Sequence, residues 1–229
     1  MENNKIIKNE VFIRGMLVGR YINDDKTTAI ICSRDENKEH PNYQYVTFFG
    51  KEKEIIDGLK ISDKVVVTAK AYVFRDKETK KANIQNLRLR GLTIETARNF
   101  SKRVIASIGV PIYGFKLLDC VRFTLSGNIV NIEETKSHKV FILLSVKDEV
   151  GNGFNLIPLM YSGKGSEESV RSVLNQYKKG DSISVKGFVA QRKIENENED
   201  NKRLYQNTYF ITSFLYSETE VDFSEFFDF

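Results

Sequence analysis

The chain has 229 residues, with 35 basic and 31 acidic side chains and a net charge of +4. This length accommodates two domains of roughly 100 residues, each with its own core. No apolar run approaches the ~18 residues of a membrane-spanning helix, and the first ten residues lack the apolar centre of a signal peptide. We therefore expect a cytoplasmic protein that has no association with a membrane.

The first half of the chain, residues 9–94, contains a regular order of short elements. It runs from an opening strand interrupted by Gly15, through two further strands, to a short helix after Gly50-Lys51. Two closing strands around a charged loop, RDKETKKA at 75–82, complete the half. Five short strands with a helix between the third and the fourth are typical of the small Greek-key barrel called the OB fold.

Residues 119–215 repeat this order, with Gly127 in the opening strand and Gly163-Lys164 before the helix. The loop between the last two strands, IENENEDNK at 194–202, is mostly acidic, whereas its counterpart in the first half is basic. We therefore predict a mainly β protein with two tandem OB-fold barrels, each with a short helix, and an acidic tail. The predicted parts are a first barrel at 1–94, a connector at 95–118, a second barrel at 119–216 and a tail at 217–229.

In the predicted fourth strand of the first half, side chains two residues apart share a face. One face is a row of small apolar residues that suits a barrel interior, made of Val65, Val67, Ala69, Ala71 and Val73. The other face mixes a base with aromatic rings and comprises Val66, Thr68, Lys70, Tyr72 and Phe74.

The neighbouring strands repeat this mixed outer face. Aromatic rings stack on bases and cations neutralise phosphates, so a face with both is what a single-stranded nucleic acid needs. The alternative is that these rings pack under a loop or against the second domain. In the third strand the shared face holds Tyr43, Tyr45, Thr47 and Phe49, and in the fifth strand Leu87 and Leu89 are predicted inward and Arg88 and Arg90 outward.

The segment YVTFFGKEKEIIDGLKISDKVVVTAKAYV at 45–73 resembles the heart of bacterial single-stranded DNA-binding proteins. That family has an apolar strand ending in Phe-Gly-Lys, a short helix, a lysine-glycine turn and a strand of alternating valines. In the second half, YKKGDSISVKGFVAQRKI at 177–194 carries the turn. The resemblance implies that Tyr43 and Phe49 stack on bases, with Phe74 nearest to a third family aromatic. Most members have one barrel per chain and form tetramers, so two barrels in one chain leave the oligomeric state open.

The second half offers fewer candidate residues. Its fourth strand places Lys186, Phe188 and Arg192 on one outer row. Either Tyr161 or Ser162 corresponds to Phe49, and we choose Tyr161. We expect an unequal pair in which the first barrel binds more strongly.

Residues 95–118 connect the two halves. The pattern at 96–107 predicts one amphipathic helix with Phe100, Val104 and Ile105 on a single face. Its apolar content indicates a packed connector or an interface between protomers of a homo-oligomer.

The last 13 residues, SETEVDFSEFFDF, hold five acidic side chains and no basic one, which leaves the rest of the chain with a net charge of +9. A basic body of this kind suggests a polyanionic partner. The family named above also ends in an acidic arm with a terminal phenylalanine that recruits replication and repair enzymes, although Asp228 replaces its penultimate proline. Alternatively, the tail folds against the barrels or competes with DNA for their basic surface. The candidate partner-binding residues are Asp222, Phe226, Phe227, Asp228 and Phe229.

The sequence contains no Gly-rich phosphate loop, HExxH pair or nucleophile elbow. Cys32 and Cys120 lie in different halves without the spacing of metal ligands, and His40 and His138 stand alone. We expect reduced thiols, no cofactor, no metal and no enzymatic activity.

The leading hypothesis is a sequence-tolerant single-stranded DNA-binding protein of a bacterium, phage or mobile element. It would coat DNA during replication, recombination and repair, and recruit partner proteins through its tail. The alternatives are an OB-fold adaptor of a replication or conjugation complex, and an RNA-binding protein. The candidate DNA-binding residues are Tyr43, Tyr45, Phe49, Lys51, Lys70, Tyr72, Phe74, Arg88, Arg90, Tyr161, Lys186, Phe188 and Arg192.

Overall fold

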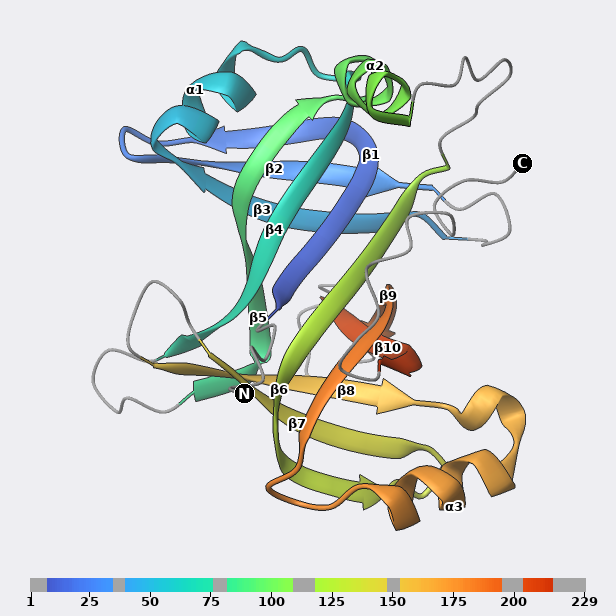
Figure 1. Cartoon of the computed structure of the whole chain (residues 1–229). Coiled ribbons are helices and arrows are strands. Elements are labelled where there is room, and N and C mark those ends of the chain that lie inside the picture. The colour runs from blue at the N-terminus through green and yellow to red at the C-terminus, as the bar shows by residue number, and fades with distance from the viewer. Residues whose placement is uncertain are drawn as a thin grey trace, which may run out of the picture. The chain divides into compact units, whose positions relative to one another are not determined.

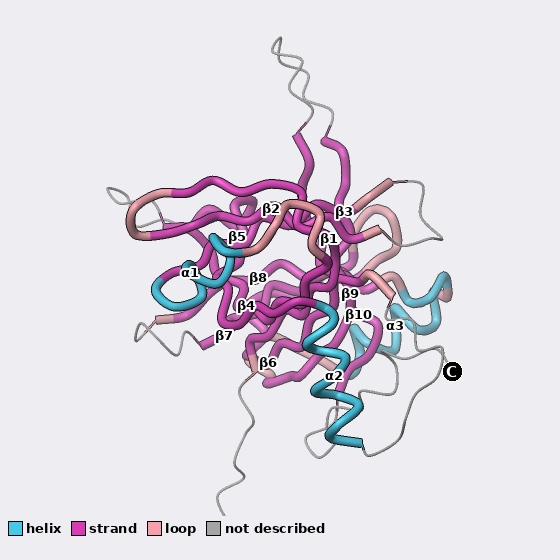
Figure 2. The backbone as a smooth tube through the Cα atoms, turned by 90° about the horizontal axis from the view of Figure 1, so that it is seen from above, coloured by secondary structure: helices cyan, strands magenta, loops and turns pink. Residues whose placement is uncertain are grey.

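The computed structural model describes residues 8–34, 40–75, 82–108, 118–147, 153–194 and 204–215. Strands dominate this part of the chain, and the helices are short (Figures 1 and 2). The fold is mainly β and consists of two tandem five-stranded barrels of the OB type, as the sequence predicted.

The first barrel is formed by β1 (Asn9–Ile22), β2 (Lys26–Ser33), β3 (Asn42–Phe49), β4 (Lys64–Arg75) and β5 (Ala82–Thr96). The strands follow one another in the order β2-β3-β5-β4-β1, and β1 also pairs with β2, which closes the barrel. The helix α1 (Gly50–Gly58) stands between β3 and β4, and α2 (Ala97–Ile108) follows β5. Thus α2 lies within one residue, at each end, of the helix predicted in the connector.

The second barrel is formed by β6 (Cys120–Glu134), β7 (Val140–Lys147), β8 (Phe154–Tyr161), β9 (Ser182–Ile194) and β10 (Leu204–Leu215). Its order is β6-β7-β8-β10-β9, and β9 pairs back to β6. A short 3-10 turn, η1 (Gly163–Gly165), and the helix α3 (Glu167–Gln176) stand between β8 and β9. Each strand of the second barrel therefore has a counterpart in the first.

The inward rows of both barrels form the cores. The predicted inner row of β4 is buried throughout, and the outer-row residue Val66 is also buried, with 4% of its surface exposed. In each barrel the alternation of apolar and polar residues therefore selects the side that faces the interior. Fully buried core residues include Ile13, Leu17, Ile31, Phe48 and Ile56 in the first barrel, and Leu125, Ile142, Leu144 and Ile157 in the second.

The glycine in each opening strand lies where that strand changes partner. Gly15 pairs with β4, and the next residue pairs with Cys32 of β2. A Cβ atom on Gly15 would lie 2.4 Å from the Cys32 carbonyl oxygen, and one on Gly127 would lie 2.2 Å from the Ser145 carbonyl oxygen. Both glycines are thus required by the close approach of two backbones as the barrel closes.

A β-bulge follows each of these glycines. On β1 it falls between Leu17 and Gly19, and on β6 it falls between Ile129 and Asn131. One extra residue in a strand reverses which side chains face the interior beyond it. Both opening strands therefore change their alternation at the same place.

The helices α1 and α3 are held by different means. Arg20 of β1 donates from Nη1 to the carbonyl oxygens of Ile56 and Leu59, both at 2.7 Å, at the C-terminal end of α1. The helix α3 instead has Ser166 as its N-cap, whose hydroxyl accepts a hydrogen bond from the Ser169 N–H, and it buries two valines, Val170 and Val173. The first helix is thus held by polar contacts together with the burial of Ile56, whereas the second buries two valines.

The chain divides into two compact units that differ from the two repeats. One unit contains the described residues of 11–70 and 89–121, and the other contains the second barrel from Arg122 onward together with the described residues of 8–10 and 71–88. Within this second unit the Asn9 side-chain amide exchanges two hydrogen bonds with the backbone of Ala71, at 2.9 and 3.0 Å. The Val73 N–H also donates to Oδ1 of the buried Asn155 of β8 at 3.3 Å. The outer part of the β4–β5 hairpin thus packs in the same unit as the second barrel.

Among the described residues, no helix is long and apolar enough to cross a membrane. In the same part of the chain, no group of three or more His, Cys, Asp or Glu side chains is arranged to hold a metal ion.

Candidate nucleic-acid interface

The strand β3 presents three aromatic side chains on the outside of the first barrel. Tyr43, Tyr45 and Phe49 expose 38%, 53% and 37% of their surface, while Gln44 and Phe48 between them are fully buried. The predicted outward row of the third strand is therefore confirmed.

A cation lies beside this aromatic row. Thr47 of β3 pairs with Arg90 of β5, and the guanidinium carbon of Arg90 lies 5.2 Å from the centre of the Phe49 ring. This distance is within the range of a cation–π contact. We refer to Tyr43, Tyr45, Thr47, Phe49 and Arg90 together as the β3 face.

The end of β3 is shaped by a glycine. Gly50 has a φ of +54°, a conformation that glycine adopts without strain, and it begins α1 directly after Phe49. Lys51 follows in the first turn of α1 and is exposed. The predicted candidate Lys51 is therefore two residues from the last ring of the β3 face.

The other candidates of the first half lie elsewhere. Lys70 is half-buried on β4, and Tyr72 is also half-buried. Arg88 is exposed on β5. Tyr72 and Arg88 belong to the unit that contains the second barrel. Phe74 is on β4, but its side chain is outside the described residues.

The match between Tyr161 and Phe49 is wrong. Phe48 pairs with Thr27 on β2, and Tyr161 pairs with Val140 at the corresponding position of β7. Tyr161 thus corresponds to the inward Phe48, and Ser162 corresponds to Phe49. The apolar residues on both sides of β8 conceal this register, because they give no alternation from which to read it.

The remaining aromatic candidates of the second barrel contact other rings. Phe188 stacks on Phe210 of β10 with ring centres 5.3 Å apart, and it pairs with the exposed Arg122 of β6. Tyr161 lies edge-on to Phe214 at 5.4 Å. Lys186 is half-buried on β9, and the side chain of Arg192 is outside the described residues.

The surface of the second barrel that matches the β3 face has different residues. Strand register gives each residue of the β3 face a counterpart: Leu156 for Tyr43, Pro158 for Tyr45, Met160 for Thr47, Ser162 for Phe49 and Phe210 for Arg90. We refer to these five residues of the second barrel as the β8 face.

Sequence reasoning missed one exposed ring next to the β3 face. Tyr21, near the end of β1, exposes 63% of its surface and pairs with Thr28 of β2. If β1 continued without a bulge, alternation would place Tyr21 on the inner side with Leu17. The bulge between them moves Tyr21 to the outer side. Gly19 is the local signal that could have revealed it, because an isolated glycine inside a strand often marks a bulge.

The half-buried Arg14 of β1 lies near Asp119, which directly precedes β6. The Nε and Nη1 atoms of Arg14 are buried and have no hydrogen-bond partner among the described residues. Burial lowers the pKa of the Arg14 guanidinium, and the nearby Asp119 partly offsets this effect. Asp119 also accepts hydrogen bonds from Nζ of Lys64 at 2.7 and 2.9 Å. This charge cluster ties the residues just before β6 to β1 and β4.

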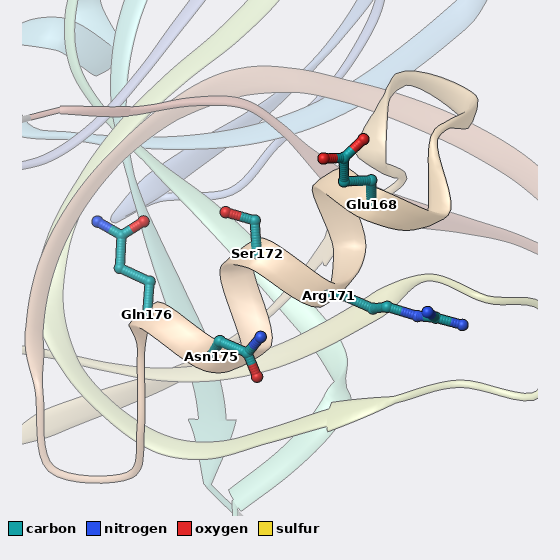
Figure 3. Close-up of a pocket in the computed structure, with 5 residues that line it drawn as sticks. All are labelled: Glu168, Arg171, Ser172, Asn175 and Gln176. Atoms are coloured by element: carbon teal, nitrogen blue, oxygen red, sulfur yellow. The ribbon is translucent and has the colours of Figure 1, made fainter.

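Two polar clusters of the second barrel have structural explanations. The exposed side of α3 borders a shallow hollow lined by Glu168, Arg171, Ser172, Asn175 and Gln176 (Figure 3). This mixture of one acid, one base and neutral groups is what the solvated side of an amphipathic helix carries.

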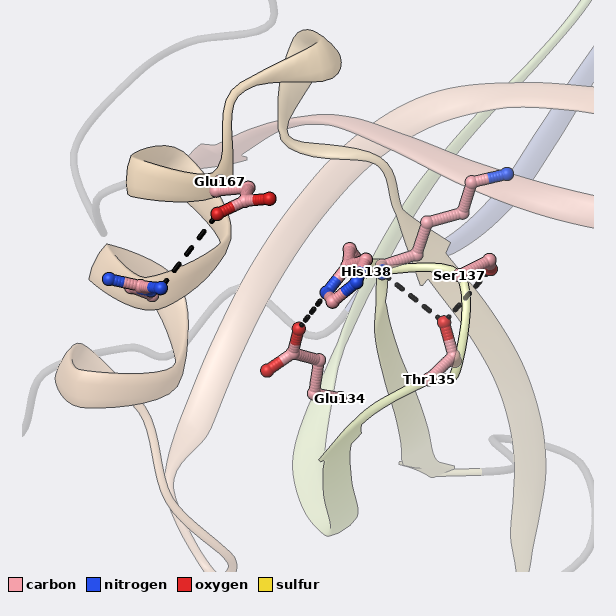
Figure 4. A network of polar contacts seen from close by, with 7 residues as sticks. Glu134, Thr135, Ser137, His138 and Glu167 are labelled. Carbon is pink, nitrogen blue, oxygen red and sulfur yellow. Dashed lines mark hydrogen bonds and ion pairs between the residues drawn. The ribbon is translucent and has the colours of Figure 1, made fainter.

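The second cluster closes the β6–β7 turn. The Nδ1 atom of His138 lies 2.8 Å from Glu134, and the hydroxyl of Thr135 contacts Ser137 and accepts from the Lys139 N–H (Figure 4). These contacts support a turn in which His138 has a φ of +52°. The candidate tail residues Asp222, Phe226, Phe227, Asp228 and Phe229, and the loops 76–81 and 195–203, are outside the described residues.

No family model matches the sequence, and no curated protein gives a significant match. Among solved structures, the chain is similar to a deletion variant of the single-stranded DNA binding protein from Thermus aquaticus. The TM-score is 0.57 at 15% identity, and the likeness covers 94% of this chain and 97% of the other. The wild-type Thermus aquaticus protein gives a TM-score of 0.54 at 15% identity, covering 95% of this chain and 98% of the other. The likeness shows a shared OB-type fold that extends over both barrels.

Proposed function

We propose that the protein binds single-stranded DNA without sequence preference, through the β3 face. The observation that carries this proposal is the row of exposed rings on β3 with Arg90 over Phe49. The proposed activity is binding without catalysis.

The position of these residues supports the proposal. In OB folds the surface of the second and third strands is the common site for oligonucleotides. Each base has a flat π-face that can stack on Tyr43, Tyr45 or Phe49, whereas base edges are not read in this way. Arg90 supplies positive charge for a phosphate and a plane for stacking. The likeness to the Thermus aquaticus proteins adds support at the level of the fold.

The test is a titration of the protein with oligo-dT, oligo-rU and duplex DNA at several salt concentrations. We expect tight binding of oligo-dT, far weaker binding of duplex, and a log–log salt slope of about −0.7 for each phosphate neutralised. Binding can be followed by tyrosine emission, because the chain has ten tyrosines and no tryptophan. A preference for oligo-rU would instead identify an RNA-binding protein, and indifference to all three ligands would favour a protein adaptor.

We further propose that the protein coats DNA during replication or recombination and recruits partner proteins through residues 217–229. The acidic, phenylalanine-rich composition of this segment supports the proposal, since such a tip suits a basic-rimmed apolar pocket. Deleting 217–229 should leave the affinity for oligo-dT unchanged and abolish binding of the partner. Tighter DNA binding by the shortened chain would show instead that the tail competes for the DNA site.

A further inference from the structure

The tip of the β1–β2 hairpin carries an exposed ring that the proposed function has not used. Tyr21 exposes 63% of its surface, and the next residue, Ile22, exposes 55%. Within the described ranges, no hydrogen bond, ion pair or ring contact involves the Tyr21 side chain. Packing inside the barrel therefore gives no reason for an aromatic residue at this position.

The bulge in β1 directs Tyr21 to the outer side of the barrel. Beyond the bulge, Arg20 pairs with the buried Ala29, and Tyr21 pairs with Thr28. Residues directly opposite one another on paired strands share a face. Tyr21 and Thr28 thus lie on the outer face, whereas Ile22 lies opposite the fully buried Thr27 on the inner one.

Four residues form a continuous row across four strands. Tyr21 of β1 pairs with Thr28 of β2, Thr28 pairs with Thr47 of β3, and Thr47 pairs with Arg90 of β5. The hydroxyls of Thr28 and Thr47 are 3.1 Å apart and hydrogen-bonded to each other. Two small side chains therefore separate a ring at one end of the row from a cation at the other.

This row crosses the β3 face at Thr47, midway between Tyr45 and Phe49. Neighbouring strands are about 4.8 Å apart, so Tyr21 is about 10 Å from β3 along the row. A strand of nucleic acid bound to the β3 face and running across the sheet would reach Tyr21 beyond the two threonines. We propose that Tyr21 stacks on a base of the bound single strand, so that the site extends from Arg90 across β2 to the β1–β2 hairpin. This inference rests on the proposed function.

The absence of tryptophan allows a direct test. Three variants each carry one tryptophan: Tyr21→Trp, Tyr45→Trp and Ile22→Trp. Stacking on a base quenches indole emission, so oligo-dT should quench the tryptophan at positions 21 and 45 strongly and at position 22 weakly. Ile22 is the matched control, because it is adjacent, similarly exposed and on the opposite face.

Affinity provides the second measurement. Tyr21→Ala should weaken oligo-dT binding by roughly 5- to 150-fold, the range for loss of one stacked base, while Ile22→Ala leaves binding unchanged. Because Tyr21 is exposed, Tyr21→Ala should retain the melting temperature of the unmodified protein.

The outcomes separate this inference from the proposed function. Quenching at position 45 without quenching at position 21, or an unchanged affinity in Tyr21→Ala, would overturn the role of Tyr21 and leave the β3 face as the site. If oligo-dT quenches neither position, the proposed function fails as well. Equal quenching at positions 21 and 22 would show a nonspecific effect at the hairpin and would also refute the stacking of Tyr21.

Discussion

The β3 face and the β8 face occupy equivalent positions on two barrels of the same fold, yet no pair of equivalent positions holds the same type of residue. The β3 face carries three exposed rings and an arginine, whereas the β8 face carries Leu156, Pro158, Met160, Ser162 and Phe210. The one charged position of the first, Arg90, is an aromatic ring in the second.

The difference between the two faces separates what maintains the fold from what provides a binding surface. The inward rows of both barrels are largely apolar and buried, and both opening strands keep the glycine and the bulge that closure needs. The outward rows are under no such constraint, because their side chains face solvent or a neighbouring segment. A duplicated barrel can therefore keep its architecture and lose the chemistry of one face.

The largest effect should come from removing two rings of the β3 face. Tyr45→Ala combined with Phe49→Ala should weaken oligo-dT binding by about 2–6 kcal/mol if the two stacked bases contribute additively. A gel shift or a fluorescence titration at fixed salt measures it. The matched control is Pro158→Ala combined with Ser162→Ala on the β8 face, which should leave affinity unchanged. Equal losses from both double variants would contradict the inequality of the two faces.

The next largest effect concerns how α1 is held. Arg20→Ala removes the donor to the Ile56 and Leu59 carbonyls at the end of α1, where α1 has no basic residue of its own. Because these hydrogen bonds come from a charged group, their loss should lower the free energy of unfolding by about 1–3 kcal/mol. Denaturant unfolding measures the loss, and Arg98→Ala, on the exposed side of α2, is the control. A loss of similar size in Arg98→Ala would show that charge alone, and not the contact with α1, is responsible.

Much of this architecture could be predicted from local sequence pattern. Alternation along β4 identified its inner row correctly, because each small apolar residue faces the interior and the pattern has a period of two. The same reasoning placed Tyr43, Tyr45 and Phe49 outside. The helix in the connector was predictable because its apolar residues recur at helical spacing, and Phe100 indeed lies 5.8 Å from Phe12.

What could not be predicted depends on partner strands. The outward position of Tyr21 follows from a bulge, which is defined by the register of β1 against β2. The correspondence of Tyr161 with Phe48 follows from the register of β8 against β7. The packing of Val73 against Asn155 joins residues 82 positions apart, and no local pattern indicates it. Each of these features is set by a distant segment of the chain.

A smaller effect is expected from the cation of the β3 face. Arg90→Ala removes the guanidinium over the Phe49 ring. Loss of this cation–π contact should lower the free energy of unfolding by about 0.5–1 kcal/mol, the range for an exposed site. If Arg90 also neutralises a phosphate, the log–log salt slope should become less steep by about 0.7. Arg90→Lys should retain the slope because it keeps the charge. As a control, Arg122→Ala on the second barrel should change neither the free energy of unfolding nor the salt slope. An unchanged slope in Arg90→Ala would place the phosphates elsewhere.

The smallest effect concerns Asp57, which ties α1 to β2 in the first barrel. Its carboxylate accepts hydrogen bonds from Lys53 Nζ and from the hydroxyl of the fully buried Thr27, both at 2.7 Å. The hydrogen bond from Lys53, followed by that from Thr27, lowers the pKa of Asp57 below its ordinary value.

A lowered pKa in the folded state stabilises the fold at pH values above the ordinary pKa, and this contribution disappears as the pH falls through the pKa of the folded state. Asp57→Asn should therefore lower the free energy of unfolding by less than about 1 kcal/mol at neutral pH, because the carboxylate is partly exposed and solvent screens its interaction with Lys53. The difference between the two proteins should shrink when unfolding is repeated at about pH 3 and below. A difference that stays constant over this pH range would show that the ionised carboxylate does not hold α1. The helix α1 would then be held by the contacts of Arg20 and the burial of Ile56 without a contribution from the ionised carboxylate.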